Sequence, residues 1–450
     1  MSAIAPQSAG LPAQEALSEL VQQVLDEARR RGASAAEAAV SVGSGLSVQV
    51  RRGEVDTIEH QRDRSLAVAV YFGHRQGTAS SADFSPASIR ATVEAACAIA
   101  RHTSEDPAQG LADPELLARE IPDLDLYHPW QLEPDDAIEL ALRCEAAALA
   151  VDQRITNSES AGVSSDAGVR VYGNSNGFMG GVRSTRHGIN CVIIAEDAGG
   201  MQRDYWYTTH RSPEMLLAAE EVGRKAADHA LRRLGGRQVS TRRTPVIYQA
   251  PVARGLLGHF VGAVRGASLY RKASFLVDSL GEQVFADQIT LQERPHLPGA
   301  LGSAAFDNEG VATCERDLVA NGVLQGYLLD SYSARRLGMT TTGNAGGVHN
   351  LDLRGGEGDL DGLLRLMGEG LLVTELMGQG VNMVTGDYSR GASGFWVEGG
   401  EIVYPVEEIT VAGNLRDMFR GIQAVGNDVD TRGNIRSGSI LIDGLTVAGE

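Results

Sequence analysis

The histidines are the first side chains to consider for metal chemistry, because a catalytic zinc ion needs three protein ligands and an open position for water. No two of them lie one helical turn apart, and the closest pair is fourteen residues apart. One helix therefore cannot present two imidazoles on one face. A site would have to be assembled from distant residues, such as His259 with His349 and Glu375. The histidines are His60, His74, His102, His128, His187, His210, His229, His259, His296 and His349.

A second candidate for chemistry is the glycine-rich run from Thr374 to Trp396. Glycine permits close backbone approach, so this run fits the wall of a cleft that accepts an extended peptide by strand addition. The composition equally fits tight β-turns and bulges in which Asp387 and Arg390 pair with each other. Both interpretations stay open on the residues alone. The candidate substrate and cavity residues are His259, Glu375, Asp387, Tyr388 and Arg390.

Two serines in this run, Ser389 and Ser393, raise the alternative of a serine nucleophile. The elbow of a serine hydrolase needs Gly-x-Ser-x-Gly at a turn from a strand into a helix. The strings here are Gly-Asp-Tyr-Ser-Arg-Gly and Gly-Ala-Ser-Gly, and no helix is predicted after them. The sequence therefore disfavours a serine hydrolase.

His259 lies in a segment that follows a predicted buried strand at residues 245–248. Apolar residues recur in it at helical spacing, which predicts a core helix over residues 251–265. On such a helix the simplest role of His259 is to donate to a backbone carbonyl, and direct contact with substrate is the alternative. The apolar residues with this spacing are Leu256, Leu257, Phe260, Val261 and Val264.

Three segments are expected to position these residues. Residues 1–120 are predicted to form a helix, strands and a second helix, and residues 121–236 repeat that order without a residue-level repeat. Gly235 and Gly236 mark the boundary to residues 237–450. There, short apolar runs separated by glycine predict a β-rich, barrel-like C-terminal domain. The predicted fold class is therefore α+β.

The charge balance argues against a nucleic-acid partner. The chain of 450 residues has 40 Lys and Arg against 58 Asp and Glu, which gives a formal net charge of −18. Binding phosphates takes clustered cations, and no basic stripe is present. No apolar run approaches the roughly 20 residues that cross a bilayer, and the first twelve residues lack the features of a secretory signal. We therefore expect a soluble, cytoplasmic protein without a membrane partner.

The four cysteines are far apart in the sequence and form no Cys-x-x-Cys pair. They stand in apolar, helical or strand-like surroundings, and free cysteine is among the most buried residue types. We expect all four to be reduced core residues. They are Cys97, Cys144, Cys191 and Cys314.

Four stretches, in order along the chain, resemble the TldD/PmbA (TldE) family and are closest to its PmbA (TldE) branch. The resemblance covers essentially the whole chain. In the catalytic TldD branch, the helix carries His-Glu-x-x-x-His before an Arg-Lys pair, and a cysteine near the C-terminus completes the zinc site. The stretches that carry the resemblance are residues 255–276, 374–380, 385–391 and 413–415.

The same alignment implies that the zinc ligands are missing from this chain. With Arg271 and Lys272 in register with the Arg-Lys pair, the two metal histidines fall on Gly258 and Ala263, and the glutamate falls on His259. Among the four cysteines, none follows position 314. The resemblance therefore implies no catalytic residue and no zinc here, and a zinc ion in a TldD-like partner.

The resemblance also implies a function. Members of the PmbA (TldE) branch pair with a TldD-like catalytic subunit and enclose a cavity for small, unfolded or leader-bearing peptides, as in microcin maturation and antitoxin degradation, with a link to DNA gyrase. The isolated chain is then expected to be inactive. Two alternatives stay open. One is a non-proteolytic peptide-binding regulatory protein that forms a homodimer when isolated, and the other is an autonomous metallopeptidase.

Overall fold

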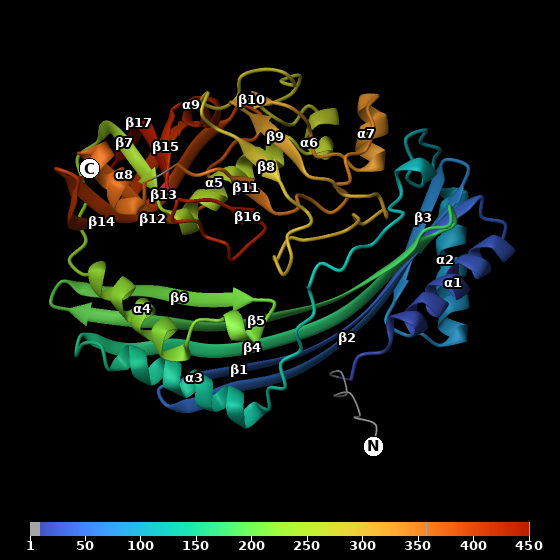
Figure 1. Ribbon diagram of the computed structural model, residues 1–450, viewed down its shortest axis with the longest axis horizontal. Helices are drawn as coiled ribbons and strands as arrows, with labels where there is room; N and C mark the ends of the chain where they lie inside the picture. Colours follow the sequence, from blue (N-terminus) through green and yellow to red (C-terminus); the bar gives the residue numbers. More distant parts are fainter. Residues whose placement is uncertain (1–9, 357, 450) are drawn as a thin grey trace.

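The computed structural model describes residues 10–356 and 358–449. Its first half is one antiparallel six-stranded sheet in the order β3-β2-β1-β4-β5-β6 (Figure 1). The two predicted helix–strands–helix units thus share a single sheet. The strands are β1 (Ala35–Arg51), β2 (Glu54–Phe72), β3 (Arg75–Ser81), β4 (Ile155–Asn174), β5 (Met179–Asp197) and β6 (Gly200–His210). The helices are α1 (Gln14–Arg30), α2 (Pro86–His102), α3 (Pro134–Leu149) and α4 (Ala219–Arg232).

Strand β1 is longer than the sequence suggests. The glycines in its middle predict a break between residues 39–42 and residues 46–50, yet the strand runs without interruption. Gly43 and Gly45 are paired on both sides, with β2 and with β4, so the ladder hydrogen bonds outweigh the turn preference of glycine. One strand therefore serves both halves of the sheet.

The helices cover one face of this sheet in two groups. Helices α1 and α2 enclose a hydrophobic cluster that includes Val40 of β1 and Val171 of β4. Helices α3 and α4 enclose a second cluster that includes Val48 of β1 and Val163 of β4. Alternate residues of both strands face these clusters, which is the period of a half-buried strand. The opposite face of the sheet is left for the C-terminal domain.

The C-terminal domain is built from two sheets. In one of them the order is β14-β13-β12-β7-β17-β15, and an additional pairing of β14 with β17 closes five of its strands into a barrel. This confirms the predicted α+β class with a barrel-like C-terminal domain. The barrel strands are β7 (Arg242–Tyr248), β12 (Gly370–Met377), β13 (Asp387–Glu398), β14 (Glu401–Asn414) and β17 (Ile440–Ala448), with β15 (Ile422–Val425) attached to β17.

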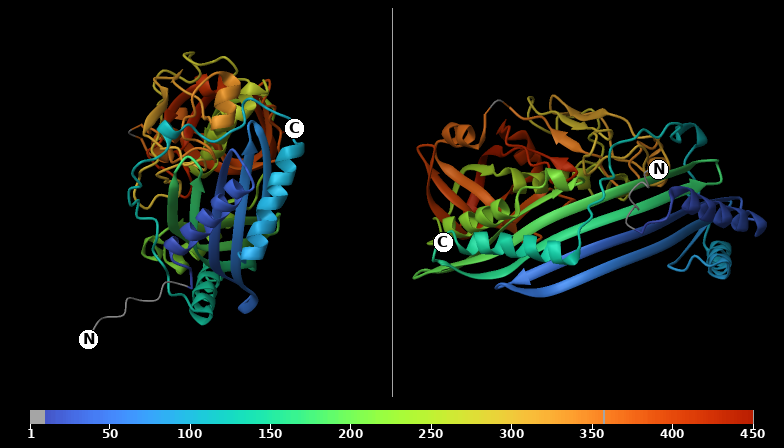
Figure 2. Two further views of the ribbon diagram at one scale, coloured as in Figure 1. Left: turned by 90° about the vertical axis from the view of Figure 1, so that its right-hand side faces the viewer. Right: turned by 60° about the horizontal axis from the view of Figure 1, so that its bottom comes forward.

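The second sheet of this domain has the order β10-β9-β8-β11-β16. Figure 2 shows the domain over the sheet of the first half, with β1 and β2 farther from it than β5 and β6. The segment boundaries expected at residues 120 and 236 stay predictions. The strands of the second sheet are β8 (Leu291–Glu293), β9 (Arg316–Ala320), β10 (Val323–Leu324), β11 (Leu351–Leu353) and β16 (Ile435–Arg436). The helices of the domain are α5 (Ala250–Ala263), α6 (Gly266–Tyr270), α7 (Ser331–Leu337), α8 (Leu360–Met367) and α9 (Leu415–Arg420).

The cysteines differ in their surroundings. Cys97, Cys144 and Cys191 are free and buried, as expected, whereas Cys314 is free but exposed. The prediction for Cys314 is wrong because the residue lies in an irregular segment before β9, next to the exposed Glu315, and not in a core strand. In the described part of the chain, no helix has both the length and the apolar character that a membrane crossing requires.

Candidate cleft beside the core helix

Helix α5 directly follows barrel strand β7, as the sequence predicts for residues 251–265, and buries one face in the main core of the C-terminal domain. Ala263 is fully buried on that face. Gly258 lies on the other side, and a Cβ built on it meets no atom within 4 Å. Five residues of a regular helix turn the side-chain direction by about 140°, which explains this difference. The two vacated metal positions therefore do not face a common space.

His259 is half-buried next to two side chains of β13. Its ring lies 6.0 Å from the Tyr388 ring, centroid to centroid, in an edge contact. Burial, and then the positive charge of Arg390, lower the pKa of His259. No hydrogen bond from its ring to another described residue is present, so the predicted bond to a backbone carbonyl does not form. Burial and the neighbouring cation thus both disfavour protonation of His259, and that cation also disfavours a metal ion at this position.

Two tyrosines lie beneath His259. Tyr388 is 2% exposed, Tyr248 of β7 is completely buried, and their rings meet in an edge contact with centroids 6.5 Å apart. Burial raises the pKa of both hydroxyls, and their proximity further raises that of Tyr248. Within the described residues neither hydroxyl completes a hydrogen bond of good geometry. Tyr388 therefore supports the ring of His259 from the core side, and Tyr248 packs against Tyr388.

Glu375 and Arg390 contribute to a cavity of about 280 Å³ between β6, the start of α5 and the β12–β13 edge. Glu375 is held by Arg233, with 2.6 Å between Oε2 and Nη1, and so ties β12 to the end of α4. Arg390 donates only a long hydrogen bond of 3.4 Å to the carbonyl of Met377. Of the candidate residues, Glu375 and Arg390 therefore share one cavity, and His259 adjoins it through Arg390.

Asp387 lies apart from the other candidates. It is exposed and accepts hydrogen bonds from the Thr385 hydroxyl at 2.6 Å and from the Asn414 amide at 3.2 Å. These bonds lower the pKa of Asp387. The pairing of Asp387 with Arg390, which was one of the two interpretations left open, is not observed, because residues three apart in a strand point to opposite faces. Asp387 fixes the turn before β13.

The glycine-rich run forms the β12–β13 hairpin with its turns. A Cβ on Gly380 would lie 1.8 Å from the carbonyl oxygen of Ser389, so tight backbone packing accounts for this glycine. Ser389 is exposed and Ser393 buried, both within β13, and no described hydrogen bond links either hydroxyl to a histidine or aspartate. A nucleophilic serine elbow is not present, because β13 continues through both positions, with an irregularity in its pairing with β14 at Ser393, and does not turn into a helix there.

The residues of the cleft do not fit a catalytic zinc ion. No group of three or more His, Cys, Asp and Glu residues that could hold a metal occurs in residues 10–356 and 358–449. The combination of His259, His349 and Glu375 considered from the sequence is not assembled, since His349 lines a different cavity and bonds the Gly343 carbonyl at 3.1 Å. No chemical step through a metal is therefore derived for this chain.

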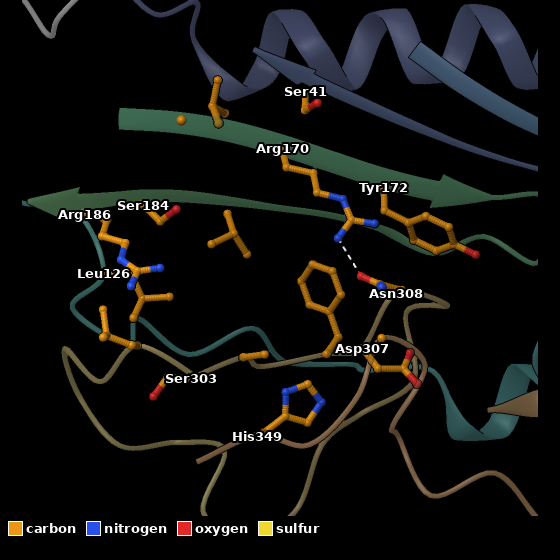
Figure 3. Close-up of a pocket in the computed structure, with 18 of the residues that line it drawn as sticks. Ser41, Leu126, Arg170, Tyr172, Ser184, Arg186, Ser303, Asp307, Asn308 and His349 are labelled. Atoms are coloured by element: carbon orange, nitrogen blue, oxygen red, sulfur yellow. Dashed lines mark hydrogen bonds between the residues drawn. The ribbon is translucent and has the colours of Figure 1, made fainter. Parts of the chain in front are cut away.

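A large cavity on the open face of the sheet was not predicted from the sequence. It has a volume of about 780 Å³ and lies between the sheet face of β1, β4 and β5 and the loops of residues 301–308 and 345–349 (Figure 3). Arg170 and Tyr172 of β4 and Arg186 of β5 point from the sheet, and His349 points from the opposite side. In the sequence, these residues are marked only by the alternation of a long strand. That alternation indicates a cavity only when it is known that the C-terminal domain packs onto this face of the sheet.

A buried carboxylate fixes one of these loops. Glu293 is 2% exposed, and its Oε2 lies 3.0 Å from Nε of Arg316. Its Oε1 accepts from the Asn344 amide at 2.7 Å and from the His349 backbone at 2.8 Å. Both oxygens are thus satisfied, as a buried charge requires. The cavity wall around His349 is built on this carboxylate.

Next to this cavity, Glu309 gives the fold a specific pH response. Burial raises its pKa from 4.5 to about 7, although Ser331 donates to it through its backbone and hydroxyl. Between pH 4.5 and about 7 the folded chain keeps a proton that the unfolded chain has released, so stability decreases as the pH rises. Glu309→Gln is expected to remove up to about 3 kcal/mol of this decrease.

The measurement is the free energy of unfolding of the wild type and Glu309→Gln at about pH 5 and pH 7.5. The free energy of unfolding of Glu309→Gln, relative to that of the wild type, should be higher at pH 7.5 than at pH 5. Glu115→Gln serves as the control, because Glu115 is an exposed carboxylate in a short helical turn. A pH response that is the same in all three proteins would contradict the assigned burial effect.

The fold and cleft define a class of protein: an α+β chain with a closed barrel whose core helix lacks the side chains of a metal site. Comparison with known families agrees with this class. Domain models described as PmbA/TldA metallopeptidase match residues 36–100 (domain 1), 127–234 (central domain) and 241–449 (C-terminal domain). The chain belongs to the PmbA/TldD family.

Individual relatives cover nearly the whole chain. Metalloprotease PmbA of Escherichia coli O157:H7 is 52% identical over 434 residues, which are 96% of each chain. A crystal structure from Bacteroides thetaiotaomicron, of a protein whose name refers to modulation of DNA gyrase, has a TM-score of 0.91 at 30% identity and covers 96% of this chain and 98% of its own. TldE from Thermococcus kodakarensis has the same fold, with a TM-score of 0.82 at 19% identity. The match covers 96% of this chain and 100% of the TldE chain.

Proposed function

We propose that this chain is the PmbA/TldE-type subunit of a heterodimeric zinc peptidase whose TldD-like partner supplies the metal. The proposed substrates are small, unfolded or leader-bearing peptides, as in microcin maturation or antitoxin degradation. Family membership and the resemblance to PmbA support this assignment. The proposed location is the cytoplasm, which is consistent with four free cysteines.

The composition of α5 is the observation that carries the proposal. A hydrolytic zinc site needs three ligands around one open position. On α5 the only imidazole is His259, which has Arg390 beside it, while Gly258 has no side chain and Ala263 is buried in the core. A peptidase complex needs only one metal for its hydrolytic step. This chain then contributes a wall of the peptide cavity.

The proposed role of this wall is to orient the peptide. The half-buried His259 and Arg390 can donate hydrogen bonds to peptide carbonyl groups, and the glycines of the α5 face let a backbone approach closely. Closure of the cavity by two subunits would exclude water from all but the reacting position. Activation of water would be the task of the partner's metal.

The test compares the purified chain, its TldD-like partner and a mixture of both in cleavage of casein and of a leader-bearing peptide. We expect cleavage in the mixture, none by the isolated chain, and no stoichiometric zinc bound to the isolated chain. Cleavage by neither subunit nor the mixture would favour a non-proteolytic peptide-binding protein instead.

Two variants make the test sharper. His259→Ala should leave the metal content of the isolated chain unchanged, because His259 is not assigned as a ligand. His60→Ala is the matched control, since His60 is exposed on β2. One outcome would establish an autonomous metallopeptidase and overturn the proposal. In that outcome the isolated chain binds zinc stoichiometrically and cleaves the peptide, and both properties are lost in His259→Ala but not in His60→Ala.

A further inference from the structure

The cavity of about 780 Å³ has a charge opposite to that of the chain. Four arginines line it, and only two aspartates do, although the whole chain carries a formal charge of −18. The carboxylate of Asp307 is engaged by the protein itself. It accepts hydrogen bonds from the backbone N–H groups of Glu309, Val311 and Ala345. Asp63 lies exposed on β2. Because the four arginines outnumber the two aspartates, the net formal charge of the cavity lining is positive.

Arg170 extends from near the C-terminal end of β4 into this cavity (Figure 3). Among the described residues its guanidinium makes one hydrogen bond, from Nη1 to the side-chain oxygen of Asn308, at 2.7 Å. Asn308 is neutral, and across the described ranges no carboxylate lies within ion-pair distance of Arg170. An arginine without a carboxylate inside a cavity presents a planar fork of donors that fits a carboxylate.

Two further arginines lie farther along the same face. Arg186 of β5 donates from Nε to the Thr209 hydroxyl at 3.2 Å, and Arg211 donates to the backbone carbonyls of Thr185 and Leu301 at 3.0 and 2.8 Å. All these acceptors are neutral. The positive charge of Arg186 is near enough to contribute to the lowered pKa of Arg211, whose main cause is burial. Asp166 lies opposite Arg186 in the β4–β5 register, yet no described carboxylate is within ion-pair distance of either arginine. Two like charges held together without a salt bridge are typical of an anion site.

The space around these arginines is elongated. Arg170 and Arg186 are on neighbouring strands, and Arg170 pairs in register with Val182, four residues before Arg186. This offset corresponds to roughly 13 Å along the strand. A second cavity of about 570 Å³ adjoins the first and shares Arg170, Tyr172, Asn308 and Ala345 with it. An extended ligand fits this shape better than a small inorganic ion.

We propose that this cavity is a carboxylate-recognition site for an extended peptide, with Arg170 and Arg186 as the binding side chains. The peptide nature of the ligand rests on the proposed function, whereas the carboxylate preference rests on the arginines. The recognised group is either the C-terminal carboxylate or an acidic side chain. Arg211 is a positioning residue, because its guanidinium is tied to two backbone carbonyls and supports the charge of Arg186.

The experiment measures binding to the isolated, full-length chain by fluorescence anisotropy. One short labelled peptide is used in four forms, with a free or amidated C-terminus and with an internal Glu or Gln. The form without any carboxylate is expected to bind at least about tenfold more weakly than the form with both, as for loss of one charge-assisted contact. Comparison of the two intermediate forms identifies which carboxylate is recognised.

Variants connect the preference to the site. Arg170→Gln and Arg186→Gln should each reduce, at least about tenfold, the difference in affinity between the peptide forms with and without carboxylates. Arg170→Lys should retain part of this difference, because lysine keeps the charge without the planar fork of donors. Arg62→Gln is the matched control, since Arg62 is an exposed arginine of β2 outside the cavity lining. Circular dichroism and thermal melting verify that each variant is folded.

Equal binding of all four peptide forms would overturn the proposal, as would an equal loss in Arg62→Gln. The same holds if inorganic phosphate binds in an Arg170-dependent manner and the peptide carboxylates do not. The outcome is independent of the cleavage test, because binding is measured without the partner subunit. A mixture that fails to cleave peptides would refute the proposed function and leave the carboxylate preference intact.

Discussion

Glu293→Ala is expected to lower the free energy of unfolding by about 3–5 kcal/mol, because it leaves Arg316, whose side chain is only 19% exposed, without its charged partner. Arg316 would lose its carboxylate at 3.0 Å and keep only the neutral oxygens of Tyr327 and Asn344. The Asn344 amide and the His349 backbone would lose an acceptor at the same time. Urea denaturation measures the change.

Glu315→Ala is the control for this prediction. Glu315 immediately precedes β9, its side chain is 52% exposed, and its Oε1 lies 3.8 Å from Nε of Arg294. An exposed ion pair of this kind contributes at most about 1 kcal/mol. Similar losses for the two variants would show that the buried network around Glu293 does not stabilise the C-terminal domain as described.

Gly394→Ala is expected to destabilise the barrel by about 3 kcal/mol. Gly394 is in β13, and a Cβ at this position would lie 1.8 Å from the carbonyl oxygen of Leu372 in the neighbouring strand β12. The obstruction is backbone, so the two strands would have to separate and lose ladder hydrogen bonds. Thermal and urea denaturation of the purified variant measure the effect.

The same substitution at Gly258 should have the opposite sign. Gly258 is within α5, and its Cβ would meet no atom within 4 Å. Replacing a helical glycine by alanine then stabilises the chain by about 0.5–1 kcal/mol, since alanine restricts the unfolded chain. A loss of stability in Gly258→Ala, or none in Gly394→Ala, would contradict the packing of the helix face and the barrel.

Local features of the C-terminal domain were predictable where one period dominates. The helical spacing around Leu256 and Phe260 places the helix within one or two residues of its observed bounds, Ala250–Ala263. The lack of two metal-binding imidazoles on this helix could also be read from the sequence, because it depends on residue types and not on packing. The short strands separated by glycine indicated a β-rich domain, although only the pairing of β14 with β17 shows that the barrel is closed.

Other features depend on contacts between distant parts of the chain. Gly43 and Gly45 resemble turn residues until both neighbouring strands are known. Asp387 and Arg390 are near in sequence but separated by the alternation of a strand. The cavity containing Arg170 forms between elements more than a hundred residues apart, as the Arg170–Asn308 bond shows. No local pattern marks such a juxtaposition.

The continuity of β1 and β4 has a mechanical consequence. Each strand contributes side chains to both hydrophobic clusters beneath the sheet, so neither cluster can be dismantled without disrupting the ladder that it shares with the other. The first half of the chain should therefore melt as one cooperative unit, and its amides in the middle of these strands should exchange with solvent only through that global opening.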